Sequence, residues 1–221
     1  MGGRGSVSYS GSREHTGGKE QPLTAYAVAS LNKGVSSGTT SDDAMNRFRD
    51  QMMDKKVEYS AYIDDNGYIH ALGSSGKEGS TGVAPFENLR NEKGNLTVIH
   101  NHPHGTSDGR IWGGSFSEND LRYVATAYYV TNGKVNRIVA TAREGTYIAN
   151  VKRKVTDKQV RRAAARAEKN AKKEKYTSEK AMWRNVNAAY AKEFGKIGIE
   201  ITFTDKKVTR DKLVTQKTGT Y

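Results

Sequence analysis

The feature that most constrains this chain is a short apolar run that ends in two histidines. Residues 96–103 read Leu-Thr-Val-Ile-His-Asn-His-Pro. The apolar and β-branched residues 96–99 predict a buried strand. Because side chains alternate between the two faces of a strand, we expect His100 and His102 to point the same way at its end. Neutral imidazole is the commonest metal ligand in proteins, so the pair predicts a shared metal ion.

A second polar cluster follows at 117–120, with the residues Ser-Glu-Asn-Asp at the start of a helix predicted over 117–129. Asp120 lies one turn into this helix and could add an oxygen ligand to the two imidazoles. Two histidines and one carboxylate leave a fourth position open for water, which is the layout of a catalytic zinc site rather than a structural one. The chain has no cysteine, so any metal must be bound by histidine and carboxylate.

Composition indicates one domain with appendages. Only 35% of the 221 residues are hydrophobic and 23 are glycine, so part of the chain is not expected to join a core. Residues 1–22 are rich in glycine and serine without periodicity, and we predict a disordered tail there. No run approaches the ~18–20 apolar residues of a membrane span, and the start lacks a signal-peptide pattern. We therefore expect a cytoplasmic protein and no membrane partner, with virion or host-cell association left open.

The middle of the chain alternates between helical and strand patterns, which predicts an α+β core over residues 41–151. A turn signal at 64–67, Asp-Asp-Asn-Gly, joins the first two strands as a hairpin. The expected elements are a helix over 41–53, strands at 57–63 and 68–72, a short helix at 86–90, a strand at 96–100, a helix over 117–129, and strands at 137–142 and 146–151.

The last third is strongly basic. Residues 151–221 carry 20 basic and 8 acidic side chains, while the rest of the chain is nearly neutral. We expect residues 152–221 to form a basic helical extension ending in a short strand near 199–203. The first helix, over 157–175, has a narrow apolar stripe that should bury little. Such charge asymmetry suggests a nucleic acid or an acidic partner. A merely solvated surface explains the charge equally well.

A zinc hydrolase also needs a general base and a group that stabilises the developing oxyanion. Glu58 is the leading candidate for the base, because it lies inside the otherwise apolar strand 57–63 just before a hairpin. The hydroxyl of Ser117 is the candidate oxyanion donor.

The order of these residues resembles the JAB/MPN (JAMM) family of metalloproteases. The motif of that family is an upstream Glu, then His-x-His-Pro, then Ser-x-x-Asp. This chain has Glu58, His-Asn-His-Pro at 100–103 and Ser-Glu-Asn-Asp at 117–120. The His-Asn-His-Pro form is most similar to the bacterial RadC-like branch, and the resemblance covers about residues 57–151.

The resemblance implies a JAB/MPN-like mixed sheet flanked by helices. It also implies a zinc ion held by His100, His102 and Asp120. Glu58 would act as base and acid for the metal-bound water, and Ser117 would donate to the oxyanion. The implied substrates are peptide and isopeptide bonds, often next to ubiquitin-like modifiers.

One departure from the family is the spacing between the second histidine and the serine. Fourteen residues, 103–116, separate them here, which is longer than the usual spacing. This insertion is either a substrate loop, with Trp112 as an apolar contact, or an ordinary surface loop. It also brings His104 and Asp108 near the site as competing ligands.

Structural roles are open for several of these residues. Ser117 could be only a helix N-cap with Asp120 at the third helical position. Glu58 could be an exposed strand residue. His70 is expected to be a satisfied sheet residue, and His15, in the tail, a bystander.

Two function classes follow. The first is a zinc-dependent peptidase or isopeptidase that acts on a protein or peptide substrate. The second is a nucleic-acid-associated protein of phage or mobile-element origin, in which the JAB/MPN-like fold is adapted or inactive and the basic extension binds. The two are compatible, because a basic extension could deliver a peptidase to a nucleoprotein.

Overall fold

A computed structural model describes residues 21–22, 25–79, 81, 85–107, 109, 111–173 and 175–205. The predicted N-terminal tail lies outside these residues except for its last two, which form the short strand β1 (Gln21–Pro22). His15, Asp108 and the segment 206–221 also lie outside the described residues.

The described residues form one sheet of seven strands in the order β1-β3-β2-β4-β5-β6-β7. Strands β4 and β5 run parallel, and the other neighbouring strands are antiparallel. The predicted α+β class, with a mixed sheet flanked by helices, is confirmed. The strands after β1 are β2 (Tyr59–Ile63), β3 (Ile69–Ser74), β4 (Leu96–Asn101), β5 (Val135–Ala142), β6 (Gly145–Val151) and β7 (Ile199–Thr204).

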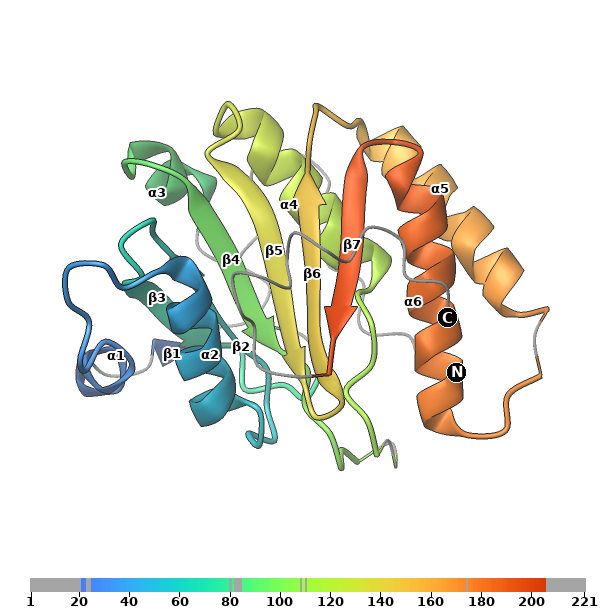
Figure 1. The fold of residues 1–221 in the computed structure, drawn as a ribbon, viewed down its shortest axis with the longest axis horizontal. Coiled ribbons are helices and arrows are strands. Elements are labelled where there is room, and N and C mark those ends of the chain that lie inside the picture. The colour runs from blue at the N-terminus through green and yellow to red at the C-terminus, as the bar shows by residue number, and fades with distance from the viewer. Residues whose placement is uncertain are drawn as a thin grey trace.

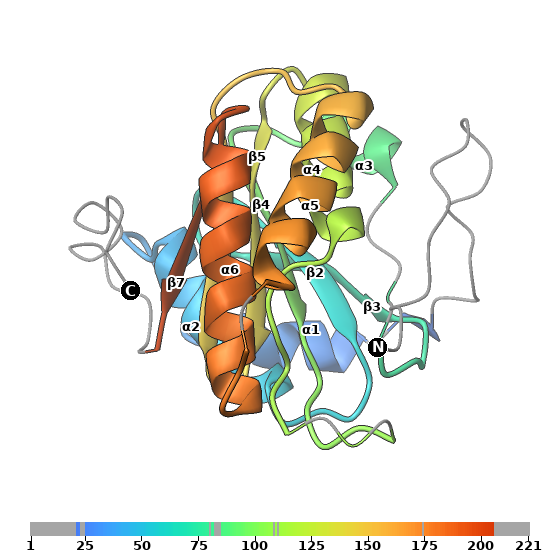
Figure 2. The same ribbon diagram turned by 90° about the vertical axis from the view of Figure 1, so that its right-hand side faces the viewer.

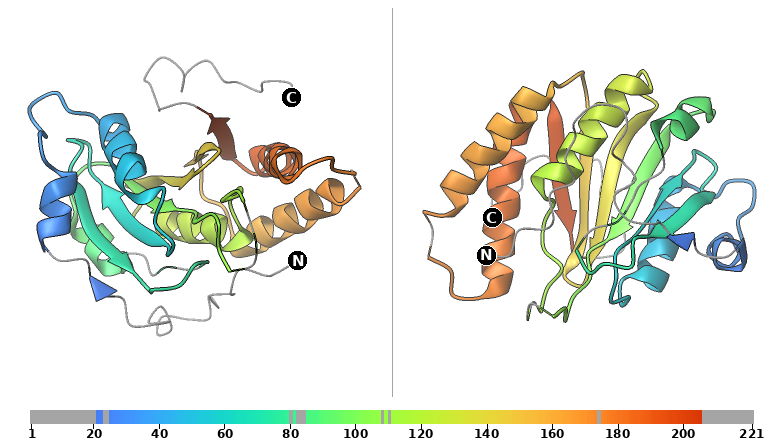
Figure 3. Two further views of the ribbon diagram at one scale, coloured as in Figure 1. Left: turned by 90° about the horizontal axis from the view of Figure 1, so that it is seen from below. Right: turned by 180° about the vertical axis from the view of Figure 1, so that it is seen from behind.

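Helices cover both faces of this sheet (Figures 1 and 3). One face packs against α1 (Ala25–Leu31) and α2 (Ser41–Met52). The other face packs against α3 (Phe86–Asn91), α4 (Glu118–Val130), α5 (Asp157–Ala171) and α6 (Glu179–Gly195). None of the helices in the described part of the chain is long and apolar enough to cross a membrane.

The alternation of β4 divides its side chains between these two cores. Ile99 belongs to the core under α1 and α2, whereas Leu96 and Val98 belong to the larger core under the other four helices. A central strand that is buried on both faces has a strongly specified register, because a slip of one residue would exchange the two sets.

The described residues of the C-terminal third, up to residue 205, continue the same sheet and core. Strand β7 pairs antiparallel with β6, and α5 and α6 lie side by side with α4 next to α5 (Figure 2). The sequence predicts that the narrow stripe of α5 buries little, but Val160, Ala163, Ala164 and Ala167 are all 0% exposed. Short alanine side chains let neighbouring helices approach closely, so a narrow stripe is enough to pack.

An ion-pair cluster also fastens α5 to α6. The carboxylate of Glu193, on α6, is buried and accepts hydrogen bonds from Arg166 Nε at 2.8 Å and Lys196 Nζ at 2.5 Å. These two cations lower the pKa of Glu193 below its ordinary value. Part of the basic charge of this region is therefore used within the fold.

Candidate metal centre

Strand β4 lies in the middle of the sheet between β2 and β5, and all six of its residues are buried. His100 is its fifth residue, and His102 follows directly after its end. The backbone N–H of His102 still donates to the carbonyl of Thr141 on β5, at 2.7 Å. The two histidines are 3% and 1% exposed, and their Nε2 atoms are 2.8 Å apart. The structure therefore brings the predicted pair together at the end of a central strand.

Glu58 joins the pair from the neighbouring strand. It lies directly before β2 and not inside the strand as predicted, because its N–H donates to the carbonyl of Lys77, beyond the end of the β2–β3 ladder. Ser60 is paired opposite His100, so the side chain of Glu58, two residues earlier, lies on the same face. Glu58 is 6% exposed, and its Oε1 lies 3.8 Å from His100 Nε2. This burial excludes the alternative of a solvent-facing strand residue.

Asn101, between the two histidines, holds the segment that carries Glu58. Its side chain is 0% exposed, and by strand alternation it points away from the face of the histidines. The Asn101 Oδ1 accepts the N–H of Tyr59 at 2.6 Å, and Nδ2 donates to the carbonyl of Val57 at 3.2 Å. Both partners flank Glu58. Sequence reasoning missed this role, although a polar side chain inside a buried strand must find partners.

Asp120 approaches the histidines from the first turn of α4, where Ser117 is the N-cap. The capping box is present: Ser117 Oγ accepts from the N–H of Asp120, and Asp120 Oδ2 accepts from the N–H and hydroxyl of Ser117 at 2.7 and 2.8 Å. Asp120 Oδ1 lies 3.6 Å from His100 Nε2, and Oδ2 lies 4.0 Å from His102 Nε2. The oxyanion role of Ser117 stays a prediction, and it requires the hydroxyl to rotate away from Asp120.

His102 is oriented from behind by a backbone carbonyl. Its Nδ1 lies 2.7 Å from the carbonyl oxygen of Gly114. A carbonyl only accepts, so Nδ1 carries the proton of the neutral ring and the lone pair is on Nε2. Histidines that bind metals are commonly held in this way, with the other ring N–H donated to a carbonyl or carboxylate.

These donors fit a metal ion. One donor atom each from Glu58, His100 and His102 lies within 4.8 Å of the others, and all three residues are buried. Ligand bonds of about 2.0–2.2 Å let two atoms on one ion lie up to about 4 Å apart. The distances from Asp120 to the two imidazoles, 3.6 and 4.0 Å, are within this range. The two carboxylates would be balanced by a divalent cation.

The other candidates that the structure describes do not join the centre. His104 Nε2 pairs instead with Asp54 at 3.6 Å, and His70 Nε2 lies 3.0 Å from Asp64 Oδ2, as expected for a satisfied sheet residue. The ring of Trp112 contacts the charged groups of Arg143 and Lys180, at 5.2 and 5.6 Å from its centroid.

Comparison with family models, with curated proteins and with solved structures finds no match to this chain. The likeness to the JAB/MPN family consequently rests on the motif residues of the sequence. The function that this likeness implies is therefore a proposal.

Replacing Asn101 tests how Glu58 is positioned. Asn101→Ala removes the partner of the partly buried N–H of Tyr59 and carbonyl of Val57, so we expect the free energy of unfolding to fall by about 1–3 kcal/mol. Chemical denaturation measures it. The matched control is Asn95→Ala, because Asn95 is exposed just before the same strand. Equal stability of the two variants would contradict the assigned role of Asn101.

Proposed function

We propose that this protein is a zinc-dependent hydrolase of peptide or isopeptide bonds with a JAB/MPN-like architecture. The observation that carries the proposal is the convergence of two imidazoles and two carboxylates at the buried end of β4. The hydrogen bond from His102 Nδ1 to Gly114 supports it, because it leaves Nε2 as a donor to a metal. The order of the motif residues along the chain resembles that of the JAB/MPN metalloproteases, and this resemblance supports amide bonds as the substrate class.

In the proposed mechanism His100, His102 and Asp120 would hold the metal. Zinc bound there would supply Lewis-acid chemistry, which lowers the pKa of water and polarises a carbonyl. Glu58 accepts the proton of the attacking water and delivers it to the leaving amine, so the carboxylate is regenerated. The hydroxyl of Ser117 donates to the developing oxyanion. Burial of Glu58 beside the histidines keeps this proton transfer away from bulk water.

Replacing Glu58 tests whether this residue is a general base or a metal ligand. Both roles are open, because the 3.8 Å between Glu58 Oε1 and His100 Nε2 also suits two ligands of one ion. Glu58→Gln keeps the shape and removes the basic oxygen. We expect turnover to fall by about 10²–10⁴-fold, with one zinc per chain retained. The assay uses fluorogenic peptides and an isopeptide-linked ubiquitin dimer, and the control is Glu87→Gln on the exposed side of α3. Full activity would refute the base role, and loss of zinc would make Glu58 a ligand.

A second candidate function is nucleic-acid binding, which is favoured by the exposed face of α5. Arg162 and Lys169 are exposed and lie two helical turns apart on this face, and the exposed Lys173 follows just after the end of the helix. Arg161 and Arg166, in contrast, are ion-paired to Asp157 and Glu193. Contacts from such a face are made with phosphates and have little sequence preference.

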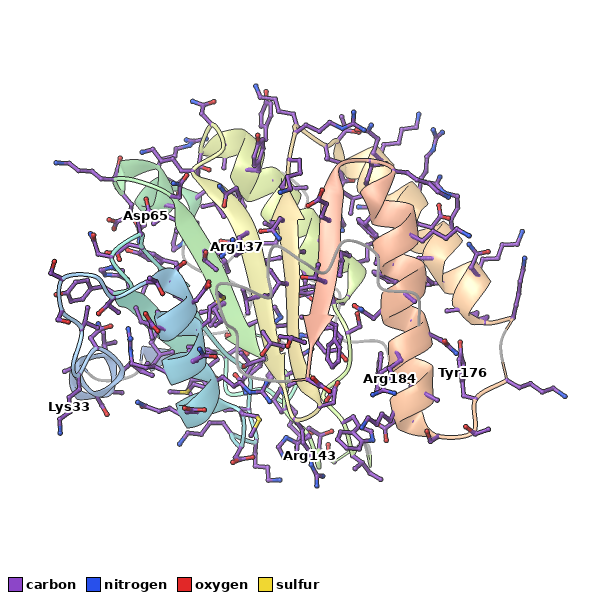
Figure 4. The ribbon with its side chains drawn as sticks, in the orientation of Figure 1. Lys33, Asp65, Arg137, Arg143, Tyr176 and Arg184 are labelled. Atoms are coloured by element: carbon purple, nitrogen blue, oxygen red, sulfur yellow. The ribbon has the colours of Figure 1, made fainter. Side chains whose placement is uncertain are left out.

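Binding through this face should depend steeply on salt. We expect the affinity for a fluorescent DNA duplex to fall by tenfold or more between about 50 and 200 mM salt. Arg162→Ala/Lys169→Ala/Lys173→Ala should reduce both the affinity and the slope of its salt dependence. The control is Lys33→Ala, an exposed lysine after α1 (Figure 4). Affinity that does not change with salt, or that the triple variant shares with wild type, would refute this function.

A further inference from the structure

Residues 111–114, here called the docked segment, are held by two carboxylates through four consecutive backbone amides. Glu179, on α6, accepts from the N–H groups of residues 111 and 112, both at 3.1 Å. Glu144, on the turn between β5 and β6, accepts from those of Gly113 and Gly114, at 3.1 and 2.7 Å. Such charge-assisted bonds are stronger than those between neutral groups. The end of the long insertion is thus fixed to two distant parts of the chain.

The docked segment reaches the metal centre through Gly114. The carbonyl of Gly114 accepts the Nδ1–H of His102, while its N–H donates to Glu144. One peptide residue therefore lies between the carboxylate of Glu144 and the ring of His102. Any displacement of Gly114 moves the acceptor that sets the orientation and tautomer of His102.

Close packing leaves the segment little freedom. Gly114 has a φ of +85°, and a Cβ there would lie 2.7 Å from the ring of Trp183 on α6. A Cβ at Gly113 would lie 2.6 Å from the carbonyl oxygen of His102. Glycine is required at Gly114 by both the left-handed backbone and the contact. The position of the Gly114 carbonyl is thus determined by α6 as well as by Glu144.

We propose that Glu144 is a positioning residue for the metal centre, and that it acts on His102 through the Gly114 carbonyl. Glu179 anchors the other half of the docked segment, so α6 contributes to metal affinity without touching the ion. The inference rests on the proposed zinc site, but it concerns how the ligand is held. It also gives the long insertion a function: its end supplies the acceptor for His102.

Zinc affinity tests this proposal, measured by competition with a chromogenic chelator. Loss of an outer partner of a metal ligand typically costs about 10–100-fold in affinity, and we expect this for Glu144→Ala. Glu144→Gln retains one acceptor oxygen, so its zinc affinity should lie between those of wild type and Glu144→Ala. The control is Tyr147→Phe, which removes a further hydrogen bond to Glu144, at 2.9 Å, that does not involve the docked segment. Thermal unfolding of each variant checks the fold.

A second measurement distinguishes a positioning role of Glu144 from a general effect on stability, and it does not depend on zinc binding. The ¹⁵N shifts of His102 in the metal-free protein report which ring nitrogen carries the proton. We expect the Nδ1–H form in wild type and Tyr147→Phe, and a mixture of tautomers in Glu144→Ala. A wild type that binds no zinc would refute the metal centre, while the tautomer would still decide the role of Glu144. Unchanged affinity and tautomer in Glu144→Ala, or equal losses in Tyr147→Phe, would overturn the proposal.

Discussion

The backbone pairing between β4 and β5 is the interaction on which the centre depends. It extends to the bond from the N–H of His102 to Thr141, and so it fixes the direction of every side chain at the end of β4. With this register, His100 and His102 face the start of α4, and Asn101 faces the other way to hold the backbone around Glu58. A slip of one residue would exchange the two sets and abolish both the ligand pair and the support of Glu58.

The C-terminal third combines a high charge with a structural role. Strand β7 extends the sheet, α6 packs against β7, and α5 packs against α4 and α6. The carboxylate of Glu193 pairs with two of the basic side chains. Helix α6 also binds the docked segment through Glu179 and Trp183. A region that carries most of the excess positive charge is therefore connected to the candidate metal centre by a few hydrogen bonds.

Local patterns predicted the parts of this fold that depend on local physics. Alternation predicted the shared direction of His100 and His102, and the Ser-x-x-Asp pattern predicted the capping box of Ser117 and Asp120. The sequence pattern places the start of β2 two residues too early, because the backbone N–H of Glu58 donates to Lys77, after β3, instead of continuing the ladder.

The remaining features depend on contacts between distant parts of the chain. Glu144 and Glu179 bind backbone amides 30–68 residues away, and any carboxylate could do so. The burial of the α5 stripe likewise depends on the helices beside it. The apolar stripe of α5 is visible in the sequence, but the extent of its burial is not, and the two carboxylates leave no motif at all.

The central claim is that the end of β4 binds one zinc ion, and metal content tests it most directly. Purified wild type and a His100→Ala/His102→Ala double variant would be supplied with zinc, dialysed and analysed for metal, with circular dichroism to confirm that both are folded. We expect one zinc per wild-type chain and none in the double variant. A folded wild type that binds no zinc, or a double variant that keeps it, would refute the metal centre.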